Sequence, residues 1–98
     1  MTFRDECNEW LNPLGYNINI IGAEDRCLIF SHDSDIFKPS IQCFNRLDGN
    51  KHCILVGGNL KMFLTLSTTE LMFKHPEIQK FIDTIAHYAK VCEENPPF

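Results

Sequence analysis

The sequence predicts an α+β fold: an antiparallel β-meander of about five strands, with an N-terminal helix and C-terminal helices packed on the sheet. Three observations predict it. Apolar residues recur with the 3.6-residue period of a helix near both ends of the chain. Between these segments they alternate with a period of two, which is typical of strands, and residues that favour tight turns separate the alternating runs.

The chain has the length of one domain, and we assign residues 1–98 to a single α+β domain. Of its 98 residues, 44% are hydrophobic and 22% are charged, a composition typical of globular proteins. No run of about 18 apolar residues is present, and residues 4–6 are charged where a signal peptide would carry apolar side chains. We therefore expect a cytoplasmic protein without a membrane partner.

The first helix is predicted for residues 2–12, where four apolar side chains share one helical face: Phe3, Cys7, Trp10 and Leu11. Thr2 can cap this helix together with Asp5 at the third helical position, in a variant of the capping box. Pro13 and Gly15 then end it.

The first strand is predicted for residues 16–22, because Tyr16, Ile18 and Ile20 alternate with two asparagines. This alternation places the three apolar side chains on one side of the strand. Residues 23–26 have the composition of an exposed hairpin connection.

Three further strands are expected from short apolar or alternating runs, at residues 27–30, 41–46 and 51–56. Residues 31–39 are interpreted as a loop, because Pro39 argues against a central strand there. Asp48 and Gly49 form the most specific turn signal in the chain, since Asp-Gly supplies the positive φ angles that a tight hairpin needs.

Residues 57–59 predict a second tight turn, and residues 60–66 alternate as a fifth strand. The capping-box pattern of residues 67–70 predicts a short helix. Pro76 fits the first turn of a longer helix, whose apolar stripe is Ile78, Phe81, Ile82, Ile85, Ala89 and Cys92. This order of elements predicts helices that cover one face of the sheet.

Chemical motifs give little support for catalysis. The five cysteines are an odd number and contain no Cys-x-x-Cys pair, so reduced thiols are expected. Cys27, Cys43 and Cys53 lie in predicted strands, where burial is expected. We predict no catalytic residue, no metal ligand and no cofactor. One alternative is a small metal- or ligand-binding domain that uses the loop containing His32 and Asp35, since spaced carboxylates bind hard cations.

The excess negative charge of −4 lies in the first half of the chain. Residues 1–49 hold eight acidic and four basic residues, whereas residues 50–98 hold five of each. The sequence pI of about 5.4 and the scattered basic residues argue against direct nucleic-acid binding. Carboxylates on a helix and its neighbouring loops can instead imitate a line of phosphates. The candidates for contact with a basic partner surface are Asp5, Glu6, Glu9, Glu24, Asp25, Asp33 and Asp35.

Some aromatic residues do not fit a single core face. Phe44 and Phe63 lie on the opposite strand parity from the expected core positions. They pack in the core through a different strand register, lie under helices on the second face, or mark a partner surface. The second alternative function is therefore a homo-oligomeric, chaperone-like or regulatory subunit that associates through exposed Phe side chains.

In size, acidity and absence of chemical motifs over the whole chain, the sequence resembles the small inhibitors carried by phages and mobile elements, particularly the anti-CRISPR proteins. The resemblance rests on no diagnostic string, so it transfers no family residue by position. It implies a non-enzymatic protein of the bacterial host cytoplasm that binds a CRISPR effector. The expected contact is the basic channel or groove that receives target DNA, where binding would block recruitment of that DNA.

Overall fold

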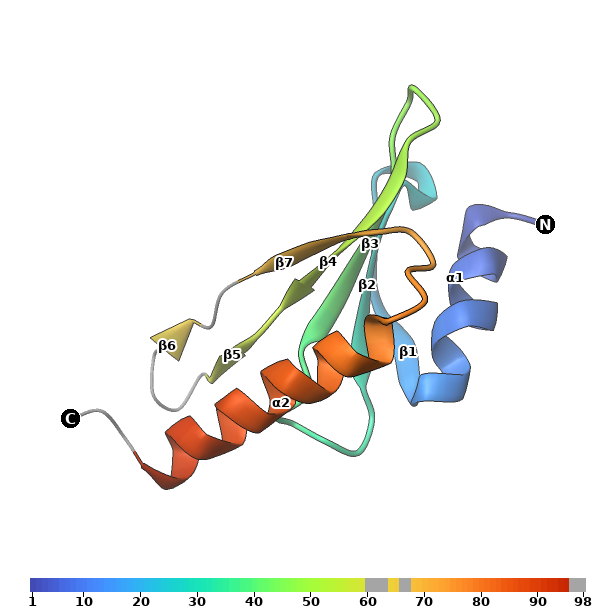
Figure 1. Ribbon diagram of the computed structural model, residues 1–98. Coiled ribbons are helices and arrows are strands. Elements are labelled where there is room, and N and C mark those ends of the chain that lie inside the picture. Colours follow the sequence, from blue (N-terminus) through green and yellow to red (C-terminus); the bar gives the residue numbers. More distant parts are fainter. Residues whose placement is uncertain (60–63, 66–67, 96–98) are drawn as a thin grey trace.

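The computed structural model describes residues 1–59, 64–65 and 68–95 (Figure 1). Its helices are α1 (Phe3–Leu11) and α2 (Ile78–Glu94), and two short 3-10 turns are η1 (Asn12–Leu14) and η2 (Ala23–Asp25). The strands are β1 (Tyr16–Gly22), β2 (Cys27–His32), β3 (Ser40–Asn45), β4 (Lys51–Val56), β5 (Gly58–Asn59), β6 (Leu64–Thr65) and β7 (Thr69–Met72).

The predicted α+β class and antiparallel meander are confirmed. Five strands form one sheet in the order β1-β2-β3-β4-β7, and every neighbouring pair is antiparallel. β5 and β6 pair with each other in a separate two-stranded sheet. The N-terminal helix α1 precedes the large sheet and a single C-terminal helix, α2, follows it. α2 crosses in front of the sheet in Figure 1.

The core lies on one face of the five-stranded sheet. The register aligns one row of fully or nearly fully buried side chains across four strands: Leu28, Cys43, Cys53 and Leu71. A second buried row contains Phe30, Ile41 and Leu55. Both helices bury their apolar stripes against these rows, α1 through Phe3, Cys7 and Leu11, and α2 through Ile78, Ile82 and Ile85.

A β-bulge in β1 changes the face on which one isoleucine lies. Ile18 is opposite Phe30, on the core face, but the register shifts before Ile20, which is opposite Ile29 on the other face. An extra residue in one strand of an antiparallel pair reverses the alternation beyond it. The expectation that Tyr16, Ile18 and Ile20 share one face is therefore wrong for Ile20, which is 53% exposed.

The capping box of α1 is present as predicted. The backbone N–H of Asp5 donates to Thr2 Oγ1 at 3.1 Å, and the backbone N–H of Thr2 donates to an Asp5 carboxylate oxygen at 3.3 Å. These two bonds satisfy donors that the first helical turn would otherwise leave unpaired. The acidic first turn of α1 is therefore fixed in place.

The short helix predicted from the capping-box pattern of residues 67–70 is wrong. Thr69–Met72 instead forms β7, which pairs with β4 and buries Leu71 in the core. A one-turn helix is marginal in isolation because nucleation is unfavourable. Ladder hydrogen bonds to β4 together with burial of Leu71 outweigh that local preference.

Three neighbouring expectations also need correction. Gly58–Asn59 is strand β5 rather than part of a tight turn. The sequence predicts residues 60–66 as the fifth strand of the meander, but of these only Leu64–Thr65 is described, as β6, which pairs with β5. The fifth strand of the large sheet is β7. The remaining positions, including Phe63, lie outside the described residues. α2 begins at Ile78, so Pro76 precedes the helix instead of occupying its first turn.

The β2–β3 loop is held by His32 and Tyr16. His32 Nδ1 accepts hydrogen bonds from the backbone N–H groups of Ser34 at 3.2 Å and Asp35 at 3.0 Å. The His32 ring packs edge-on against the Tyr16 ring, with 5.1 Å between centroids. The buried Tyr16 hydroxyl donates to the Pro39 carbonyl oxygen at 2.8 Å. The loop is thus pinned at its beginning and its end.

Gly15 lets the chain pass close to the His32 ring. Its φ of +90° is in the left-handed region, and a Cβ at this position would lie 2.5 Å from His32 Nε2. Gly49 has a similar φ of +88°, but a Cβ there would meet nothing within 4 Å. The two glycines therefore share a backbone requirement and differ only in the space around them.

Gly15→Ala should destabilise the protein more than Gly49→Ala does. Each substitution costs about 1–2 kcal/mol for the left-handed backbone, and Gly15→Ala adds displacement of the His32 ring with its two hydrogen bonds. Urea denaturation measures both free energies of unfolding. Equal losses at the two positions would contradict the close packing of His32 on Gly15.

Candidate binding surface

Four of the seven acidic candidates lie where the N-terminal part of α1 meets η2, and a fifth, Glu9, lies further along α1; we call this surface the acidic end (Figure 1). Arg4 Nη2 joins the two elements, because it donates to Asp25 Oδ1 at 2.8 Å. The acidic end consists of Asp5, Glu6, Glu9, Glu24 and Asp25. Residues from separate parts of the sequence therefore contribute to one surface.

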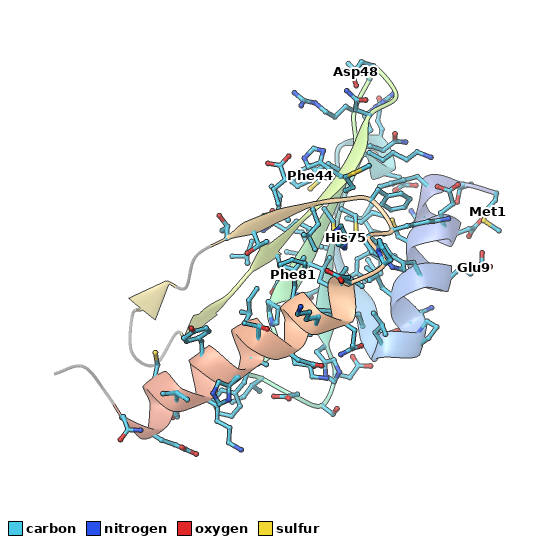
Figure 2. The ribbon with its side chains drawn as sticks, viewed as in Figure 1. Met1, Glu9, Phe44, Asp48, His75 and Phe81 are labelled. Carbon is cyan, nitrogen blue, oxygen red and sulfur yellow. The ribbon has the colours of Figure 1, made fainter. Side chains whose placement is uncertain are left out.

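Three cations neutralise part of this surface. Besides the Arg4–Asp25 pair, Lys51 Nζ lies 3.0 Å from a Glu6 carboxylate oxygen, and Arg26 Nε lies 3.9 Å from Glu24. The Glu24 side chain nevertheless remains 88% exposed. Glu9 is also exposed and points away from the sheet (Figure 2). Glu24 and Glu9 are thus the carboxylates that a partner can reach most directly.

Local hydrogen bonds keep two of the α1 carboxylates charged. The backbone and side-chain hydrogen bonds of Thr2 lower the pKa of Asp5. The hydrogen bond from Lys51 lowers the pKa of Glu6, although partial desolvation acts in the opposite direction. Asp5 and Glu6 are therefore both ionised at neutral pH. Neither takes up a proton there to reduce the repulsion between the carboxylates of the acidic end.

The η2 turn holds its two acids in an unfavourable backbone conformation. Glu24 has φ 58° and Asp25 has φ 62°, so two consecutive non-glycine residues are left-handed. A hairpin turn with two such residues strongly favours Asn-Gly, because other side chains clash with the backbone there. The left-handed conformation costs about 1–2 kcal/mol per residue. This turn presents carboxylates at the expense of fold stability.

The other two candidates, Asp33 and Asp35, lie at the opposite end of β2 from η2 (Figure 1). The six residues of β2 separate the two places, a span of about 20 Å. The Asn17 side-chain amide donates to Asp33, and the Phe37 N–H donates to Asp35 Oδ1 at 3.0 Å. The structure therefore does not bring all seven candidates together.

Asp83 of α2 is a further carboxylate, and the sequence did not reveal that it lies near Asp35. Burial raises the pKa of the Tyr16 hydroxyl, and the charges of Asp35 and then Asp83 raise it further. Both carboxylates therefore act on the same buried ring from different elements. In the sequence Asp83 is only one of several polar residues on the outer face of a helix, and no local signal relates it to Asp35.

The loop containing His32 has no metal centre among the described residues, since nowhere in residues 1–59, 64–65 and 68–95 do three His, Cys, Asp or Glu side chains converge on a point where they could hold an ion. His32 Nδ1 already accepts two backbone hydrogen bonds, and Asp35 accepts a third within the same loop. The residues that suggested a cation site instead shape the loop.

The buried cysteines are poor nucleophiles. Cys7, Cys43 and Cys53 are fully buried, and all five cysteines are free thiols. A hydrogen bond with Cys7, followed by burial, raises the pKa of Cys43 far above its ordinary value. Burial raises the pKa of Cys53 to about 12. Because the thiolate is the reactive form, Cys43 and Cys53 are unreactive at neutral pH. Cys27 differs, since it is half-buried.

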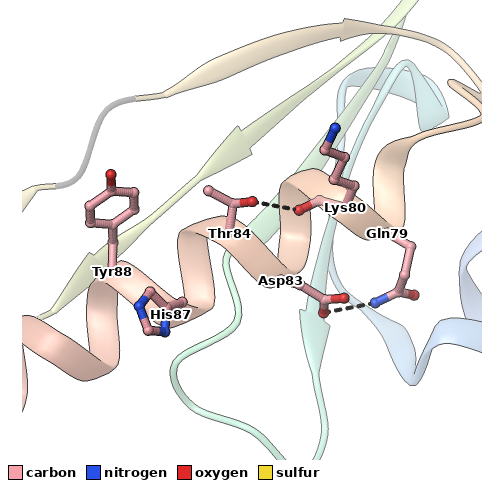
Figure 3. A pocket seen from close by; sticks show the side chains of 6 residues that line it. All are labelled: Gln79, Lys80, Asp83, Thr84, His87 and Tyr88. Atoms are coloured by element: carbon pink, nitrogen blue, oxygen red, sulfur yellow. Dashed lines mark hydrogen bonds between the residues drawn. The ribbon is translucent and has the colours of Figure 1, made fainter.

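Shallow depressions follow the outer side of α2. One is lined by Gln79, Lys80, Asp83, Thr84, His87 and Tyr88 (Figure 3). Its polar groups bond within the helix, since Gln79 donates to Asp83 at 3.0 Å and the Thr84 hydroxyl donates to the Lys80 carbonyl oxygen at 2.8 Å. A second lies against the β2–β3 loop, next to Asp35 and Lys90. Neither pairs a nucleophile with a base.

The sheet face opposite the core is covered by no described helix, and we call it the open face. Its central row runs Ile20, Ile29, Gln42, Ile54 and Glu70 across the five strands. The next row runs Gly22, Cys27, Phe44, His52 and Met72. Phe44 therefore lies away from the core, as its strand parity indicated (Figure 2). Its ring stacks on His52 at 4.9 Å between centroids and 13° between planes.

Comparison with known proteins gives no relative for this chain. No family model, curated protein or solved structure matches it. Among the described residues, neither helix combines the length and the hydropathy that crossing a bilayer requires.

Lys51→Met should raise the pKa of Glu6 toward its ordinary value and leave that of Asp5 lowered, because Lys51 acts on Glu6 and Thr2 acts on Asp5. NMR titration of the side-chain carboxyl groups measures both. The stability that the Lys51–Glu6 pair adds is present above the unfolded carboxyl pKa and disappears as pH falls through the lowered folded value. Thr2→Val is the reciprocal control, and equal shifts of both carboxyls in either variant would contradict this assignment.

Glu24→Gly should stabilise the fold by about 1 kcal/mol, because glycine adopts the left-handed conformation without a clash. Asp25→Gly relieves the same backbone but loses the ion pair with Arg4, so its gain should be smaller. Thermal unfolding of the two variants compares them. A lower melting temperature for Glu24→Gly would show that the Glu24 side chain contributes to the fold.

Proposed function

We propose that this protein is a non-enzymatic inhibitor of a nucleic-acid-binding effector, with a bacterial CRISPR effector as the partner. Its acidic end would dock on the basic surface that receives target DNA. The observation that carries the proposal is the η2 turn, where Glu24 and Asp25 take the place of the Asn-Gly that the backbone favours. Carboxylates displayed at a cost in stability are expected where a cationic partner provides compensating energy.

The geometry of the acidic end suits partial imitation of a phosphate backbone. The capping box fixes the first turn of α1, and the Arg4–Asp25 ion pair ties η2 to it. The backbone that carries Glu9 and Glu24 is therefore already ordered, so binding loses conformational entropy mainly from these two side chains. Exposed Glu9 and Glu24 then meet Lys or Arg side chains of the partner, while the paired Glu6 and Asp25 hold the neighbouring elements in position.

The electrostatic contribution should be moderate. Five carboxylates share the acidic end with Arg4, Arg26 and Lys51, so its local net charge is about −2 at neutral pH. Charge complementarity of this size increases the association rate and sets orientation more than it adds affinity. Binding is therefore expected to weaken with added salt without being abolished, and shape complementarity must supply the remaining free energy.

The test reverses the two exposed carboxylates, with Glu9→Lys and Glu24→Lys in one chain. The variant should associate with a CRISPR effector complex at least about tenfold more slowly at low salt, because steering by opposite charge is lost. Surface-immobilised effector and a salt series measure the association rate. Added target DNA should displace the wild-type protein.

The matched control places Glu93→Lys and Glu94→Lys at the far end of α2, with the same change in net charge. It should associate faster than the Glu9/Glu24 variant, provided both keep the wild-type unfolding profile. Equal slowing by both variants would remove the acidic end as the contact surface. Failure of the wild-type protein to bind any CRISPR effector, at low salt and without DNA, would overturn the partner assignment.

A further inference from the structure

We propose that the open face is the interface of a homodimer, in which two copies of this chain pack face to face around a two-fold axis lying over β3. This inference concerns a surface other than the acidic end, and it does not depend on the partner proposed above.

The open face is more apolar than a solvated sheet face usually is. Antiparallel sheets with one wet face normally carry polar side chains there. Here Ile29, Ile54 and Phe44 lie half-buried at its centre, while Ile20 and Met72 are 53% and 77% exposed. These residues form neighbouring rows across the strands, so they make one continuous surface.

The charge of the open face favours a second copy over a nucleic acid or an anionic lipid surface. Among the described strand residues of this face, none is Lys or Arg, and Glu70 is the only carboxylate. Phosphate groups require clustered cations. Glu70 lies on the edge strand β7, where it would stay at the solvated rim of a sheet-on-sheet interface.

Most positions of the two rows meet a compatible position under this two-fold axis, and the exception, Ile20 opposite Glu70, lies on the edge strands at the solvated rim. β3 is the middle strand, so an axis parallel to it gives the largest overlap and places β2 over the β4 of the second copy. Ile29 then faces Ile54, and Phe44 faces its own symmetry mate. Met72 on the edge strand β7 faces Gly22 on the edge strand β1 of the second copy. The long methionine side chain therefore meets a residue that has no side chain.

The area is sufficient for a dimer of modest affinity. Beside the two rows described above, a third contains Asn17, Ser31, Ser40 and Val56. Five strands about 4.8 Å apart and these three rows, about 7 Å apart, give roughly 500 Å² of flat area per copy. Two copies bury about 1,000 Å², and the corrugation of the side chains adds to that figure. Specific interfaces begin near this size. We therefore expect a dimer that dissociates in the micromolar concentration range.

The strands of the two copies run parallel in this arrangement. Both η2 turns then lie at the same end of the dimer, because each joins β1 to β2 at the same end of its sheet. The α1 helices remain on the outer sides, since they cover the core faces. The dimer would leave both acidic ends available.

Sedimentation equilibrium of the full chain tests the proposal directly. The wild-type protein should change from monomer to dimer across the micromolar range. Ile54→Lys should weaken the dimer by at least about tenfold, whereas Tyr88→Lys, on the outer side of α2, should leave it unchanged. A monomeric wild-type protein at the highest concentration, or an unaltered dimer in Ile54→Lys, would overturn the proposal.

Both substituted positions lie off the core, and circular dichroism with thermal unfolding checks that the variants fold. If Ile54→Lys fails to fold, Ile54→Thr provides the second variant. It keeps a β-branched side chain and removes apolar contact area, so it should weaken the dimer to a smaller extent.

A mixing experiment tests the axis itself. Ile29→Lys and Ile54→Glu should each be monomeric, because each directs a charge at an isoleucine of its symmetry mate. Mixed together they should form a heterodimer at concentrations where neither variant self-associates, because the introduced ammonium group of one copy then faces the introduced carboxylate of the other. An axis that places β2 over β2 predicts no such rescue, so a mixture that stays monomeric would overturn the arrangement.

Discussion

Burial of one sheet face against two helices is the constraint on which the rest of this structure depends. The row from Leu28 through Cys43 and Cys53 to Leu71 spans four strands and receives the apolar stripes of both α1 and α2. Burial of such side chains is the main favourable contribution to folding. Because both helices lie on this face, the described helices leave the opposite face uncovered.

The position of α1 on the core also creates the acidic end. Once Phe3, Cys7 and Leu11 are buried, the polar side of the same helix must face outward. Arg4 then reaches Asp25, and Lys51 of β4 reaches Glu6. Exposed ion pairs of this kind contribute little stability. Their consequence is mainly geometric, because they order carboxylates that would otherwise move independently.

The two proposed surfaces meet different physical requirements. The acidic end offers ordered charge and little apolar area, which suits steering toward a basic groove. The open face offers apolar area and little charge, which suits a second sheet at a spacing of about 10 Å. The β1–β2 hairpin contributes to both, with η2 at its tip and Ile20 and Ile29 on its open side. The bulge in β1 is what places Ile20 beside Ile29.

The sequence by itself determined the elements whose signals are local. The period of α1, the Thr2–Asp5 cap and the Asp48-Gly49 hairpin all follow from neighbouring residues, and all are present. Local patterns succeed where the interactions that decide the conformation lie within a few residues of each other.

Only the tertiary structure decided the features that depend on distant partners. The capping-box pattern of residues 67–70 predicts a helix, but pairing with β4 makes Thr69–Met72 a strand instead. The bulge in β1 is visible only once β1 is aligned with β2. The sequence identified seven acidic candidates but not their division into five at η2 and α1 and two beyond the far end of β2. That division depends on which strand ends lie next to α1. Burial of residues that are distant in the sequence decides this arrangement, so a short stretch of neighbouring residues cannot predict it.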